Sequence, residues 1–182
     1  GLVIFTLLNV YLYFEEGLDF YKNYFRIGIS GLIGGIGLGT AMITFIWSIT
    51  NTTVAITLLC LAAMPFITAL LGFLFLKENI SISVWVAIIV ASIGIIIMAY
   101  GIDSLGSIEG LIFGLVSAIG FSIFSVSLRW RKETPKFTTV AVAGMFCTIT
   151  SATILYQNDL SFFSSSKNEG LFAVHGTIVC LG

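Results

Sequence analysis

The chain has 182 residues, of which 58% are hydrophobic and only 9% are charged, and its formal net charge is −1. A water-soluble fold of this length needs a polar surface, and ordinary domains carry about 25% charged residues. The composition therefore excludes a soluble domain and favours a chain whose outer surface meets lipid. The near-zero net charge gives no support for a nucleic-acid partner.

Charged residues fall in short clusters, and long apolar segments fill the spaces between them. In hydrocarbon, every backbone amide and carbonyl needs a partner within its own segment, so such segments are predicted to be helices, and about 20 residues cross a bilayer. The prediction is an all-α, polytopic transmembrane helix bundle with five full spans and a partial span at each end. In chain order the segments cover residues 1–14, 27–49, 53–76, 83–101, 108–129, 137–156 and 170–182.

The two end segments are too short to span a membrane. The first begins at Gly1 rather than at a methionine, and the last ends at Gly182. Residues 1–14 lack both the basic stretch and the small-residue cleavage site of a signal peptide. We interpret the chain as truncated at both ends; the alternative is two short helices that lie at the membrane surface.

The basic residues are divided unequally between the two sets of predicted loops. Loops 15–26, 77–82 and 129–136 together hold seven of the eight, whereas the alternate loops hold only Lys167. The positive-inside rule predicts that the first set is cytoplasmic. We expect a multi-pass protein of the cell membrane, with the lipid bilayer as its partner. The three tryptophans also fall at predicted membrane surfaces, where amphipathic rings are enriched: Trp47, Trp85 and Trp130.

Glycines recur at four-residue intervals in two of the predicted spans. Gly31, Gly35 and Gly39 share one face of the span at 27–49. Gly110 and Gly114 repeat the spacing in the span at 108–129. Such a face lets another helix approach to backbone contact. We interpret these glycines as helix-packing positions, with a thin wall beside a substrate as the alternative.

A proline and a few polar side chains are the candidates for a substrate cavity. Pro65 lies in the middle of the span at 53–76, where its ring displaces the hydrogen bond to the Leu61 carbonyl and is expected to kink the helix. Kinked helices near the midplane are common in transporters, although many are purely structural. The candidate cavity residues are Thr40, Thr44, Trp47, Thr57, Pro65, Ser122, Ser125 and His175.

Catalytic and metal chemistry finds little support in the residues. No predicted span carries Asp, Glu, Lys or Arg within its core, which also argues against coupling through an embedded carboxylate. The single histidine, His175, cannot by itself compose a nucleophile–base pair or a ligand set. The cysteines lie in apolar segments without CxxC or Cys/His spacing. We therefore expect no enzyme activity, no metal and no cofactor.

Four stretches of the chain form a recognisable series. A helix ends in a polar turn over 45–55, and a proline-bearing helix closes on a Lys–Glu corner over 63–78. A helix with Trp and Gly follows over 85–94, and a new glycine-rich helix begins over 110–122. This series resembles the EamA-type transporters of the drug/metabolite transporter superfamily, with good likeness over about residues 29–130.

The resemblance implies ten helices in two five-helix repeats of opposite orientation around a central substrate cavity. Residues 1–104 would be the first repeat without its first helix, and residues 105–182 the start of the second. The family moves small metabolites, often amino acids outward, so the resemblance implies a permease that works by alternating access. Substrate, direction, coupling and oligomeric state stay open. The alternative is a non-transporting membrane protein that acts as an assembly partner.

Overall fold

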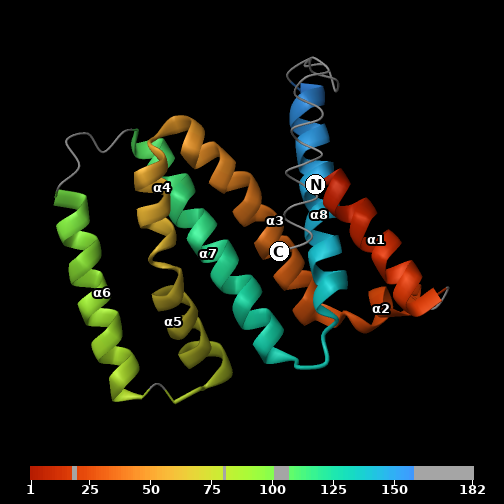
Figure 1. Ribbon diagram of the computed structural model, residues 1–182, viewed down its shortest axis with the longest axis horizontal. Coiled ribbons are helices and arrows are strands. Elements are labelled where there is room, and N and C mark those ends of the chain that lie inside the picture. Colours follow the sequence, from red (N-terminus) through yellow and green to blue (C-terminus); the bar gives the residue numbers. More distant parts are fainter. Residues whose placement is uncertain (18–19, 80, 101–106, 158–182) are drawn as a thin grey trace.

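The computed structural model describes residues 1–17, 20–79, 81–100 and 107–157, and all regular structure in these ranges is helical (Figure 1). The predicted all-α bundle is thereby confirmed. The segment at 170–182, with His175, lies outside the described residues. The helices are α1 (Leu2–Glu16), α2 (Phe20–Arg26), α3 (Gly28–Asn51), α4 (Val54–Leu61), α5 (Met64–Leu76), α6 (Ile82–Tyr100), α7 (Ile108–Trp130) and α8 (Lys136–Gln157).

Four helical stretches of the described chain are long and apolar enough to cross a membrane. They are Gly28–Asn51, Val54–Leu76, Ile108–Trp130 and Lys136–Ile154, the second of which is α4 and α5 together. Of the five full spans expected from the sequence, the remaining one corresponds to α6, an apolar helix of 19 residues. The first partial span corresponds to α1, an apolar helix of 15 residues.

Successive spans run in opposite directions, so their connections gather at two ends of the bundle (Figure 1). One end holds α2, the α5–α6 connection and the α7–α8 connection; we call it the basic end. The opposite end holds the α3–α4 turn and the start of α7. The basic end carries Lys22, Arg26, Lys77, Arg129, Arg131, Lys132 and Lys136.

The core of the bundle is built from small side chains. α3 packs against α7 on one side and α8 on another, α8 also packs against α1, and α7 also packs against α4 and α5. The fully buried alanines Ala41, Ala118 and Ala141 lie on α3, α7 and α8. Large apolar side chains face outward instead, as on α6, where Ile97 is 67% exposed. This arrangement is typical of membrane helices, which associate through close backbone approach rather than through hydrophobic exclusion from water.

Two local features differ from the sequence-based expectation. The predicted loop at 15–26 contains the short helix α2, which is tied to α1 by a hydrogen bond from the Tyr24 hydroxyl to Asn9 Oδ1 at 2.8 Å. The predicted single, kinked helix at 53–76 is interrupted at Ala62 and Ala63, between α4 and α5. The proline lies in the first turn of α5, where its missing amide costs no helical hydrogen bond.

Candidate functional site

The helices α3 and α7 approach to backbone contact at their middles. A Cβ atom added at Gly120 would lie 2.6 Å from the Gly37 carbonyl oxygen, and one added at Gly37 would lie 3.1 Å from the Gly120 carbonyl oxygen. The Ser117 hydroxyl donates to the Ala41 carbonyl at 2.9 Å within the same contact. Because no side chain separates the two backbones, this pair has little room for relative movement.

The glycines singled out in α3 lie along α8. A Cβ at Gly35 would meet the Val142 side chain at 2.7 Å, and one at Gly39 would meet Phe146 at 2.7 Å. Gly31 lies near Thr134, just before α8 begins. Thus α3 has two small-residue faces: one with Gly35 and Gly39 toward α8, and one with Gly37 and Ala41 toward α7.

The glycines singled out in α7 lie against the α3–α4 turn and α4. A Cβ at Gly110 would come within 2.7 Å of Thr52, and one at Gly114 within 3.0 Å of Cys60 and of Ser48. A polar cluster fills the same place: the Ser48 and Thr57 hydroxyls are 2.8 Å apart, and Ser48 donates to the Gly110 carbonyl at 2.8 Å. Both side chains are fully buried, so Thr57 is closed off in this conformation.

The interruption between α4 and α5 is bridged by a side chain from α7. The Ser122 hydroxyl lies 3.0 Å from the Met64 carbonyl oxygen and 2.8 Å from the carbonyl oxygen of Ala118 in its own helix. Thr68, one turn along α5, has a buried hydroxyl without a hydrogen-bond partner. Threonine in a helix commonly donates to the carbonyl four residues earlier, which here is Met64. The Ser122 hydroxyl therefore donates to the Met64 carbonyl, which is also the usual hydrogen-bond acceptor for the Thr68 hydroxyl.

Of the other predicted cavity residues, three are half-buried on α3 and α7 and one lies outside the described residues. Thr44 donates to the Thr40 carbonyl in its own helix at 2.8 Å, and both residues are half-buried. Ser125 is also half-buried, on α7. His175 lies outside the described residues. In the part of the chain that the structure describes, no three His, Cys, Asp or Glu side chains gather to form a metal site.

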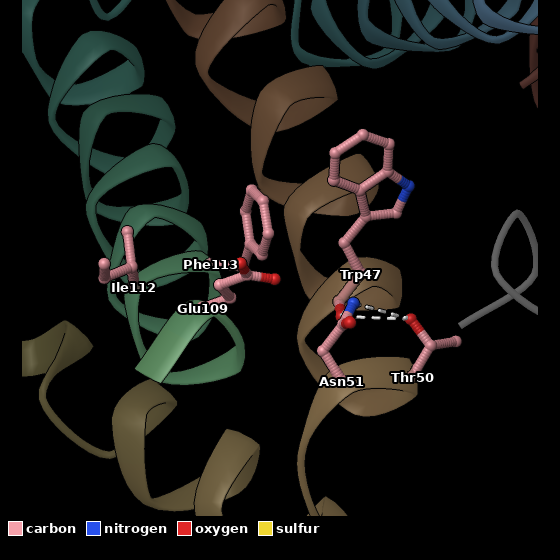
Figure 2. A pocket seen from close by; sticks show the side chains of 6 residues that line it. All are labelled: Trp47, Thr50, Asn51, Glu109, Ile112 and Phe113. Carbon is pink, nitrogen blue, oxygen red and sulfur yellow. Dashed lines mark hydrogen bonds between the residues drawn. The ribbon is translucent and has the colours of Figure 1, made fainter. Parts of the chain in front are cut away.

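A hollow of about 570 Å³ lies between α3 and α7 at the end opposite to the basic end; we call it the Trp47 hollow. The Trp47 and Phe113 rings meet edge to face, with centroids 5.1 Å apart and an interplanar angle of 89°. Figure 2 shows the Glu109 and Phe113 side chains extending from α7 toward α3. The Asn51 side chain donates to the Trp47 carbonyl at 2.8 Å. The hollow therefore combines an aromatic pair, an amide and a carboxylate.

A second hollow, of about 460 Å³, lies nearer the basic end between α3, α5 and α7; we call it the Trp130 hollow. Its lining is almost wholly apolar, whereas the Trp47 hollow adds an amide and a carboxylate to its apolar lining. The lining side chains include Ile33, Leu71, Phe75, Ile123, Val126 and Trp130.

Among the predicted cavity residues that the structure describes, Trp47 alone lines either of these two hollows. Sequence reasoning missed Glu109 and Phe113, which lie 62 and 66 positions beyond Trp47 along the chain. The available signal was the position of Glu109 at the start of a span, on the same predicted membrane side as Trp47. That signal places two residues at one membrane surface but cannot tell which helices are neighbours.

The apolar helices, their alternating directions and their small-residue contacts define a multi-pass membrane protein. The sequence model of the EamA-like transporter family matches residues 1–100, which is more than half of the chain. The chain therefore belongs to this family of membrane transporters, as its sequence predicted. The match includes residues 1–28, which lie outside the range of about 29–130 over which the sequence resemblance is good. No curated protein and no solved structure matches the chain.

Proposed function

We propose that this chain forms part of a permease that moves a small metabolite, an amino acid or a similar solute, across the cell membrane by alternating access. The basic end would face the cytoplasm, and residues 1–104 and 105–182 would belong to two repeats of opposite orientation. The observation that carries the proposal, beside membership of a transporter family, is the helix interrupted between α4 and α5 next to a hollow. Interrupted helices at membrane depth are tolerated where they face protein or a wet cavity.

The interruption supports movement because the regular helical hydrogen-bond pattern of the span is broken at Ala62 and Ala63. α4 is held to α3 by the buried Ser48–Thr57 contact, whereas α5 borders the Trp130 hollow. α5 packs against α7, and the side-chain hydrogen bond described between them near the interruption runs from Ser122 to the Met64 carbonyl. A hinge of this kind absorbs the change of backbone angles in a few residues while the flanking helices stay intact.

The Trp47 hollow supports a solute with a positively charged amine. Glu109 is exposed and has no cationic partner among the described residues. An ammonium group placed beside it would gain an ion pair and contact with the electron-rich faces of the aromatic pair. Amino acids carry such a group, and this hollow would receive or release it on the side opposite to the basic end.

Reconstitution of the intact protein in liposomes tests the proposal. We expect saturable flux of at least one solute from a panel of amino acids, other amines, sugars and nucleotide sugars. Replacing Glu109 by Gln should raise KM for an amine-bearing substrate about two- to fivefold, because an exposed ion pair contributes at most about 1 kcal/mol. The control is Glu133→Gln, which removes an exposed carboxylate in the α7–α8 connection.

Two results would contradict the proposal in different ways. No flux over the whole panel, with protein that remains folded, would favour the assembly-partner alternative. Flux that responds equally to the Glu109 and Glu133 substitutions would leave transport standing but would remove the Trp47 hollow from the path of the amine.

A further inference from the structure

The C-terminal corner of α5 directs a carboxylate back toward α7. Lys77 has a left-handed backbone with φ of 53°, and its amide donates to the Gly72 carbonyl. The Glu78 amide donates to the same carbonyl at 3.3 Å. The left-handed Lys77 and these two bonds to the Gly72 carbonyl end the helix, and the Glu78 side chain lies beside Gly72.

This end of α5 places Glu78 beside the basic end of α7, where its carboxylate forms an ion pair with Arg129. Gly72 makes room for this pair: a Cβ atom added there would lie 3.0 Å from Glu78 Oε2 and 3.7 Å from Arg129 Nη2. The two partners are 51 positions apart in the chain and belong to different spans. The pair therefore joins the C-terminal end of α5 to the last turn of α7.

The ion pair between Glu78 and Arg129 is weak and can open at little cost in free energy. The Glu78 and Arg129 side chains are 39% and 45% exposed, so water screens their attraction, and pairs of this kind add little to stability. α5 packs against α7, and between the pair and the Ser122 bond to Met64 their interface borders the Trp130 hollow. The pair lies at the basic end of this interface, outside the lining of the hollow.

We infer that the Glu78–Arg129 pair is a latch that holds α5 against α7, and that its opening lets α5 move away from α7 and uncovers the deep side of the Trp130 hollow at Val126. α5 moves about the interruption at Ala62 and Ala63, and α7 stays with α3. Glu78 and Arg129 are positioning residues in this scheme, because neither needs to touch the solute. The inference rests on the proposed transport function, since only a transporter requires the hollow to open and close.

Cysteine labelling of the intact chain in lipid nanodiscs tests the latch. Val126 is 7% exposed and lines the Trp130 hollow, so Val126→Cys reports its opening in a background with Cys60, Cys147 and Cys180 replaced by Ala. We expect Glu78→Gln and Arg129→Gln each to speed labelling by a water-soluble maleimide about two- to fivefold, the range that loss of an exposed pair allows. The double exchange Glu78→Arg with Arg129→Glu should restore the slow rate.

Two controls separate a latch from general loosening. Ala141→Cys reports on the fully buried contact of α8 with α1, far from the latch, and its labelling should not change. Lys132→Gln removes an exposed charge from the same end and should leave labelling at position 126 unchanged.

Several outcomes would overturn the latch. They are unchanged labelling at position 126 in both single variants, faster labelling at both reporters, and a double exchange that stays as fast as the single variants. If neither single variant folds, the pair is a structural requirement rather than a latch, and the inference also fails. Labelling needs no transported solute, so absence of flux in the unmodified protein would defeat the proposed function without altering the labelling result.

Discussion

The helix α7 has two long interfaces that are built in opposite ways. Toward α3, backbone meets backbone at Gly37 and Gly120, and the Ser117 hydroxyl bonds across the contact. Toward α5, a hollow lies between two polar contacts, the Ser122 bond to Met64 and the Glu78–Arg129 pair. The middle of the α3–α7 interface is therefore packed backbone against backbone, whereas the α5–α7 interface combines packing with a hollow and two described polar contacts.

This difference shows how one bundle can combine a fixed part with a movable part. Close packing of small residues resists sliding, because any displacement drives backbone atoms together or forfeits all their contacts at once. An interface with a hollow and two breakable polar contacts has fewer contacts to lose. We expect α3 and α7 to move together, and α5 to move against them. Substitutions should change the free energy of unfolding most at the α3–α7 contact and least at the end of α5.

Gly120→Ala should disrupt the α3–α7 contact most strongly. The new Cβ atom would lie 2.6 Å from the Gly37 carbonyl oxygen and 2.9 Å from the Ala41 Cβ, and neither backbone has space to yield. We expect a loss of about 1–3 kcal/mol in the free energy of unfolding, as for other overpacked sites. Thermal unfolding of the detergent-purified protein measures it.

Gly34→Ala is the matched control for that substitution. Its Cβ would meet the Ser127 Cβ at 3.1 Å and the Thr139 Cγ2 at 3.3 Å, which are side-chain contacts that can shift by a few tenths of an ångström. The loss should be clearly smaller. Equal losses at the two positions would show that the backbone contact at Gly120 has no special weight.

Ser122→Ala should weaken the hold of α7 on α5 without touching the α3 interface. It removes the bond to Met64 and frees that carbonyl for Thr68, so the net loss should be about 0.5–1 kcal/mol. Ser92→Ala is the control, because Ser92 bonds only the Ile88 carbonyl of its own helix. Unfolding curves of the two variants should differ; if they coincide, the bond across the interruption carries no measurable energy.

Lys77→Gly should have the smallest effect, and its sign should be stabilising. Lys77 adopts a left-handed conformation in which glycine is favoured, so the gain should be about 0.5–1 kcal/mol. Lys77→Ala removes the same charge without relieving the backbone, and it should stabilise less or not at all. A stability ranking with alanine above glycine would contradict the helix end described for α5.

Much of the fold follows from the pattern of the sequence. The predicted spans at 27–49 and 108–129 coincide closely with α3 and α7, because a single apolar segment in lipid satisfies its own backbone groups as a helix. Pro65 predicted that the span at 53–76 departs from a regular helix near its middle. In the structure the departure is an interruption between α4 and α5. Of the candidate cavity residues within the described ranges, only Trp47 lines a hollow in this conformation, and the role of all the candidates in transport stays a prediction.

Hydropathy, the spacing of charges and the positions of Pro and Gly thus determine which segments enter the membrane and where each begins and ends. These are properties of single segments. The tertiary structure alone decided that Gly35 lies against α8 while Gly37 lies against α7, and that Glu78 meets Arg129. The physical reason is that lipid solvates every apolar helix face about equally well, so the choice of partner depends on the fit between surfaces that are distant in the sequence.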